Sequence, residues 1–67
     1  MKLKKFVKLI GAYTDTTMKV SINRNDCVKP IETTVFCVES IAESMGCGEM
    51  KVTSFDVFKD EIRIFVA

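Results

Sequence analysis

The residue types that carry most enzyme chemistry are sparse in this sequence. Histidine is absent from the 67 residues, which removes the commonest general base at neutral pH and the most frequent metal ligand. Three carboxylates, Asp56, Asp60 and Glu61, lie close together at the expected tip of a hairpin near the C-terminus. Turns favour such residues, so we expect a solvated turn there rather than an acid–base pair. The sequence predicts no enzyme and no small-molecule substrate.

The three cysteines, Cys27, Cys37 and Cys47, are the residues best suited to bind a soft metal, with Asp26 or Glu49 as a fourth ligand. Structural zinc sites usually contain close ligand pairs such as C-x-x-C, whereas neighbouring cysteines are ten residues apart here. An odd number also argues against a disulfide framework. We therefore expect free, buried cysteines that pack as small apolar groups, and no metal or other cofactor.

One local concentration of charge stands out near the N-terminus. Lys4, Lys5 and Lys8, together with Lys2, lie opposite an apolar stripe, where they could contact phosphates or an acidic partner. The simpler interpretation is the solvated face of an amphipathic helix. No aromatic residue alternates with the lysines, which weakens a single-strand or RNA hypothesis.

Composition indicates a small folded protein. Hydrophobic residues make up 48% and charged residues 28% of the chain, and the formal net charge is +1. We interpret residues 1–67 as one small domain whose limited core favours burial against a partner. A neutral chain is not a general nucleic-acid binder. No targeting signal or membrane span is evident, so we expect a cytoplasmic protein with no membrane partner.

The first half of the chain predicts one helix and two strands. Residues 2–10 have apolar side chains at helical spacing (Leu3, Phe6, Val7 and Ile10), and Gly11 stands where a helix C′ glycine belongs. Residues 18–22 alternate apolar and polar side chains, as a half-buried strand does. After a turn at residues 23–26, the β-branched and aromatic run of residues 31–36 predicts a second strand, with Pro30 at its start.

The second half predicts a helix followed by a hairpin. Residues 38–45 form a short helix that ends at Gly46, and the boundary with the preceding strand falls between residues 34 and 38. Residues 50–58 and 61–66 form the hairpin around Lys59-Asp60. Apolar side chains change parity within the first of these strands, which indicates either a bulge near Thr53-Ser54 or a strand covered on both faces. The order α-β-β-α-β-β predicts an α+β domain, with a mostly antiparallel four-stranded sheet and two short helices on one face.

Two segments carry a resemblance to known proteins: LKKFVKLIGAYTDTTMKVSI at residues 3–22 and MKVTSFDVFKDEIRIFVA at residues 50–67. Together they resemble a loose set of short, uncharacterised proteins of phages, prophages and other mobile elements of Gram-positive bacteria. The resemblance covers about two-thirds of the chain and rests on the pattern of elements. It implies a small α+β fold and a mobile genetic setting, and it implies no catalytic or binding residue.

Taken together, these features favour a non-enzymatic interaction module that binds a copy of itself or a host or phage protein. An open sheet has unpaired edges, and a small core gains from burial against a partner. We expect Phe36, Phe58 and Phe65 to contribute an apolar interface if their side chains point away from the helices. The alternative is a nucleic-acid-associated regulator that uses Lys2, Lys4, Lys5 and Lys8, and this is the less favoured partner class.

Overall fold

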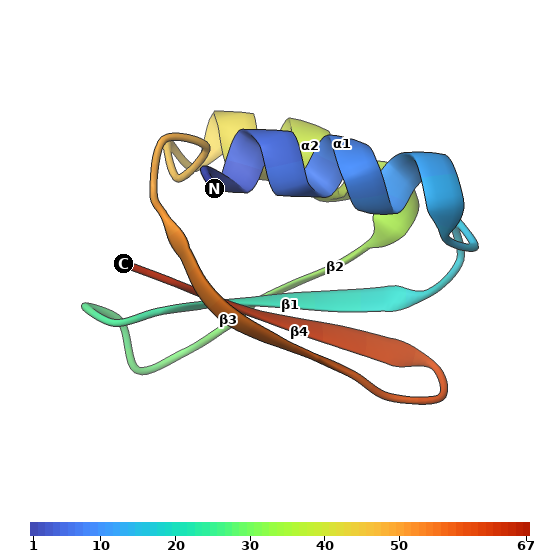
Figure 1. Ribbon diagram of the computed structural model, residues 1–67. Helices are drawn as coiled ribbons and strands as arrows, with labels where there is room; N and C mark the ends of the chain where they lie inside the picture. The colour runs from blue at the N-terminus through green and yellow to red at the C-terminus, as the bar shows by residue number, and fades with distance from the viewer.

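The computed structural model describes residues 1–67 as two layers, with both helices on one face of a four-stranded sheet (Figure 1). The predicted α+β class and the order of the elements are confirmed. Neither helix has the length and apolarity needed to cross a membrane. The elements are α1 (Leu3–Tyr13), β1 (Lys19–Arg24), β2 (Ile31–Thr34), α2 (Val35–Ser44), β3 (Val52–Val57) and β4 (Glu61–Val66).

The sheet is mixed, with strand order β2-β1-β4-β3. Two antiparallel hairpins, β1–β2 and β3–β4, form its halves, and the predicted hairpin around Lys59-Asp60 is confirmed. The halves join through a parallel pair between β1 and β4, which runs from Lys19 opposite Glu61 to Arg24 opposite Val66. This pair is parallel because α2 carries the chain back across the sheet between the two hairpins. The outer edges are therefore β2 and β3.

The core lies between the sheet and the helices. Alternate side chains of β1 and β4 point toward the helices, as the sequence pattern predicts. The apolar stripes of both helices pack onto them. The buried apolar residues are Leu3, Val7, Val20, Ile22, Val35, Val38, Ala42, Cys47, Ile62, Ile64 and Val66.

The prediction of three buried cysteines is wrong for two of them. All three are free, but only Cys47 is buried, where its Sγ lies 3.7 Å from the carbonyl oxygen of Ala42. Cys27 is exposed in the turn after β1. Cys37 is exposed because it points outward from α2, next to the buried Val38. No group of three or more potential ligands is close enough to hold a metal ion.

α2 begins at Val35, directly after β2, so the predicted boundary between residues 34 and 38 is confirmed, whereas the predicted extension of the strand to residue 36 is wrong. The first backbone N–H groups of a helix have no partner within the helix and need another acceptor. Here Val35 N–H donates to the carbonyl of Met18 (2.9 Å), and Phe36 N–H donates to that of Thr16 (3.0 Å). These acceptors lie in a distant loop, so the local sequence pattern does not reveal where the helix begins.

The two predicted helix-ending glycines differ in outcome. Gly11 lies inside α1, which continues to Tyr13, so its predicted C′ role is wrong. Gly46 has φ +72° and ends α2 as predicted. Gly46 N–H donates to the carbonyl of Glu43 (3.1 Å), and Cys47 N–H donates to that of Ala42 (3.0 Å). These two bonds form a Schellman motif.

A bulge explains the change of parity in β3. The register of the β3–β4 pair shifts between Val52 and Ser54, which confirms one of the two predicted explanations. The other, a strand covered on both faces, is wrong because β3 is exposed except at the half-buried Val52. The bulge lets Phe55 and Val57, opposite Ile64 and Ile62, lie on the same side of the sheet as the helices.

Candidate functional site

The three predicted interface phenylalanines do not form one patch. Phe36 is 79% exposed on α2, in the helical layer. Phe65 is half-buried and lies between two buried residues of β4, so its side chain points to the uncovered face of the sheet. Phe58 follows β3, where the guanidinium of Arg63 lies 4.7 Å from the centre of its ring. The interface role of these residues stays a prediction.

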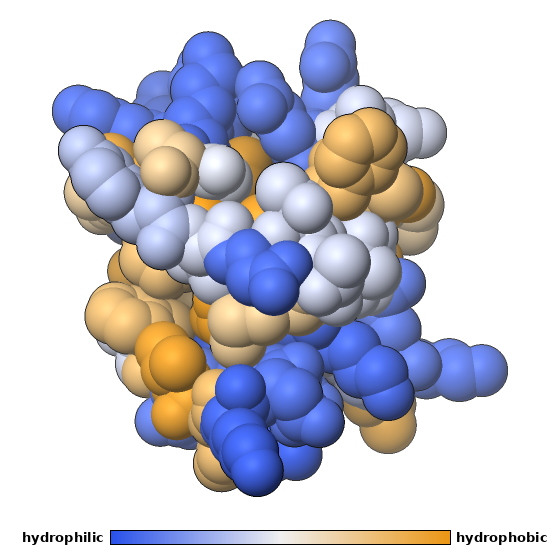
Figure 2. Space-filling view, turned by 90° about the vertical axis from the view of Figure 1, so that its right-hand side faces the viewer, coloured by the Kyte–Doolittle hydropathy of each residue, from blue (hydrophilic) through white to orange (hydrophobic).

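A more continuous apolar surface lies between α1 and β3. The rings of Phe6 and Phe55 pack with their centres 5.1 Å apart and their planes at 47°. Beside them is a shallow groove of about 300 Å³, called the α1–β3 groove below, whose apolar lining residues are Met1, Phe6, Leu9, Val52 and Phe55. Figure 2, which faces the end of the molecule that carries the turn between β3 and β4, shows orange side chains in separate patches among polar ones. The side chains around this groove are only partly covered by the protein itself.

Backbone groups next to the groove also lack partners. Phe58 N–H donates to the carbonyl of Glu61 (2.7 Å), so the backbone of Phe58 faces β4. The backbone N–H and C=O groups of successive residues in a strand point to opposite sides of it. Those of Asp56, two residues before Phe58, therefore also face β4, whereas those of Phe55 and Val57 face away from β4, toward solvent. The side chains of Phe55 and Val57 are 51% and 64% exposed. The same two residues thus present both unpaired backbone groups and apolar side chains.

This free edge is short and has defined limits. At one end the N-terminal segment already pairs with the strand, since Val52 N–H donates to the carbonyl of Met1 and Leu3 N–H donates to that of Met50, both at 2.8 Å. At the other end the chain turns at Lys59-Asp60 into β4. Residues 54–58 remain, and they are called the free edge of β3 below. They contain no proline and one charged side chain, that of Asp56.

The opposite edge of the sheet is better protected against pairing. β2 has only four residues, follows Pro30 and has mainly polar side chains. Short strands, proline and charged residues are the usual means by which proteins blunt sheet edges. Of the two edges, β3 is therefore the one suited to accept another strand.

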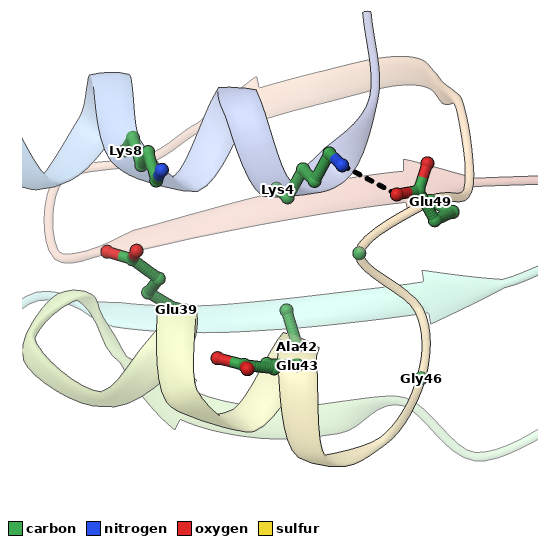
Figure 3. Close-up of a pocket in the computed structure, with 8 residues that line it drawn as sticks. Lys4, Lys8, Glu39, Ala42, Glu43, Gly46 and Glu49 are labelled. Atoms are coloured by element: carbon green, nitrogen blue, oxygen red, sulfur yellow. Dashed lines mark hydrogen bonds and ion pairs between the residues drawn. The ribbon is translucent and has the colours of Figure 1, made fainter.

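The predicted lysine surface is partly neutralised by acidic side chains. The Nζ atoms of Lys2 and Lys4 each lie 2.6 Å from a carboxylate oxygen of Glu49. Hydrogen bonds from these two lysines lower the pKa of Glu49 from 4.5 to about 2. Lys4 and Lys8 also line a groove of about 320 Å³ between the helices, together with Glu39, Glu43 and Glu49 (Figure 3). Lys5 is exposed.

The carboxylates at the hairpin do not converge on a common point. Glu61 accepts a hydrogen bond from Nε of Arg63 (2.8 Å), which raises the pKa of Arg63. Asp56 lies opposite Arg63 on the uncovered face of the sheet, and Asp60 is exposed in the turn. Asp60 lies in an exposed turn, as predicted, and the ion pair of Glu61 with Arg63 lies within β4.

No family model matches the chain, and no curated protein or solved structure matches it either. The phage or mobile-element resemblance therefore stays a prediction.

Sequence patterns alone do not reveal the α1–β3 groove, although they contain one signal for it. The parity change in residues 50–58 marks the place where a bulge turns Phe55 and Val57 to the helical side. The missing information was the position of α1, which lies beside Phe55 but leaves the edge of β3 open.

Proposed function

We propose that this protein is a non-enzymatic interaction module that binds an extended segment of a partner along the free edge of β3. The observation that carries the proposal is the coincidence of unpaired backbone groups and exposed apolar side chains at Phe55 and Val57. In strand addition, backbone hydrogen bonds supply affinity and adjacent apolar surfaces supply selectivity. The α1–β3 groove provides such a surface on one side of the edge.

The nucleic-acid alternative has less support. Two of its four lysines are engaged by Glu49, and the groove between the helices contains three glutamates beside Lys4 and Lys8. Phosphate binding would have to displace or outweigh these carboxylates. We also propose a cytoplasmic location, because three unpaired thiols, two of them exposed, fit a reducing compartment.

A peptide titration followed by NMR tests the proposed function. The probe is a synthetic peptide with the alternating sequence KVTVTVK, which is unrelated to this chain, and the control is the scrambled peptide KVVTTVK. We expect amide shift changes at residues 54–58, Phe6 and Leu9, and none at β2. Shift changes confined to β2, or none at millimolar peptide, would contradict strand addition at β3.

A further inference from the structure

We infer that the partner at the free edge of β3 is a second copy of this chain, paired antiparallel about a twofold axis through Asp56. This inference rests on the proposed function and names its partner. The dimer would place Phe55 of each copy opposite Val57 of the other and extend the two sheets into one.

The length of the free edge selects this register. Residues 54–58 are limited by the Met1 pairing at Val52 and by the turn at Lys59-Asp60, and their midpoint is Asp56. In an antiparallel pair, outward-facing residues lie opposite outward-facing residues and exchange both backbone hydrogen bonds. An axis through Asp56 pairs Phe55 with Val57 twice, so every outward-facing N–H and C=O group of the free edge gains a partner.

The neighbouring registers satisfy fewer of these groups. An axis through Phe55 would place Val57 of one copy opposite Thr53 of the other, at the bulge and next to the position that Met1 already occupies. An axis through Val57 would place the turn residue Lys59 opposite Phe55. Each shift therefore leaves one regular hydrogen-bonded pair instead of two and creates two irregular pairs.

The twofold arrangement also brings the two apolar grooves together. Its axis is perpendicular to the joined sheet, so α1 of both copies lies on the same side of the new strand pair. Phe55 and Val57 from the two copies then cover one another between the grooves, which Phe6 and Leu9 border. A standard interface buries about 800 Å² on each partner. A five-residue edge is only about 17 Å long, so both grooves are needed to approach that area, and a second copy supplies the matching groove.

The charge of Asp56 affects the strength of this dimer. Asp56 of each copy would face Asp56 of the other across the axis, on the uncovered face of the sheet, with Arg63 behind each carboxylate. Like charges placed directly opposite each other weaken a strand pair. With a short interface and this repulsion, the dimer is weak and forms at high protein concentration.

A charge-reversal experiment tests both the partner and the register. Sedimentation equilibrium would compare the wild type, Asp56→Asn, Asp56→Lys and an equimolar mixture of wild type with Asp56→Lys. We expect Asp56→Asn to tighten the dimer roughly 1.5- to 5-fold, because the cross-strand repulsion is removed. Asp56→Lys alone should remain as weak as the wild type or weaker, and the mixture should associate more tightly than either protein alone.

Glu32→Lys provides the matched control, since Glu32 is an exposed acidic residue on the other edge strand. It should leave the association constant unchanged, and circular dichroism would verify that all variants are folded. A mixture that associates no more tightly than its components would overturn the register. A chain that stays monomeric at about 1 mM, yet shows the peptide-induced shifts at residues 54–58, would overturn self-association and leave the proposed strand-addition function intact. A chain that stays monomeric and also shows no peptide-induced shifts at residues 54–58 would contradict both proposals.

Discussion

The ring of Phe6 on α1 packs against the ring of Phe55 on β3, with 5.1 Å between their centres. This contact joins the first helix to the edge strand of the sheet. It also leaves Phe55 half exposed, so the residue both stabilises the fold and borders the surface on which the proposed function depends.

Replacement of Phe55 by serine should therefore lower both stability and association. We expect a loss of about 1 kcal/mol in the free energy of unfolding, since the aromatic pair and part of its buried area disappear. Urea denaturation measures this loss. Phe36→Ser is the matched control, because Phe36 is 79% exposed, and its effect should remain within about 0.5 kcal/mol. Equal losses in the two variants would show that the Phe6–Phe55 contact contributes little.

The two glycines of the helices should respond to alanine in opposite directions. Gly11 lies within α1, and a Cβ atom there would meet nothing within 4 Å, so Gly11→Ala should stabilise the protein by about 0.5–1 kcal/mol. Gly46 has φ +72°, so Gly46→Ala should destabilise it by about 1 kcal/mol. Thermal unfolding of the two variants measures both changes. Stabilisation by Gly46→Ala would contradict the Schellman end of α2.

The ion pairs of Glu49 predict a specific dependence of stability on pH. The pKa of Glu49 is lowered to about 2 in the folded protein, below its ordinary value of 4.5. The unfolded chain therefore takes up this proton first, and the contribution of Glu49 to stability is present above pH 4.5 and lost as the pH falls toward 2. The difference in Tm between wild type and Glu49→Gln should shrink over that range. A difference that is constant from pH 6 to pH 2 would show that the lysine pairs have no such effect.

The thiols should react in two classes. Cys27 and Cys37 are exposed and Cys47 is buried in the core, so a thiol reagent should modify the first two rapidly and the third only on unfolding. Absorbance at increasing denaturant concentration measures the number of reactive thiols. Immediate reaction of all three in the native protein would contradict the position of Cys47.

The sequence patterns revealed more of the local structure than of the way the helices and strands pack together. The alternation of Ile62, Ile64 and Val66 predicted the buried face of β4, and Gly46 predicted the end of α2. The sequence placed the start of α2 only within residues 34–38, because the acceptor for Val35 N–H is the carbonyl of Met18, which tertiary folding brings there. The parallel pairing of β1 with β4 could not be predicted from local sequence either, since it joins segments about forty residues apart.

The candidate site depended still more on tertiary structure. The parity change predicted the bulge in β3, but periodicity gives no information about which edge of a sheet remains open. That depends on the strand order and on where the N-terminal segment pairs. Residue type points to Phe36, Phe58 and Phe65, whereas Phe55 and Val57 stand out by their unpaired backbone groups.

Amide hydrogen exchange at Phe55 and Val57, measured by NMR as a function of protein concentration, tests the central claim most directly. Both amides face outward from the free edge of β3 in the single chain. The proposed dimer predicts that their exchange slows as concentration rises, while the amides of β2 are unaffected. Exchange of Phe55 and Val57 that stays fast and independent of concentration up to about 1 mM would contradict the claim that this edge pairs with a second copy.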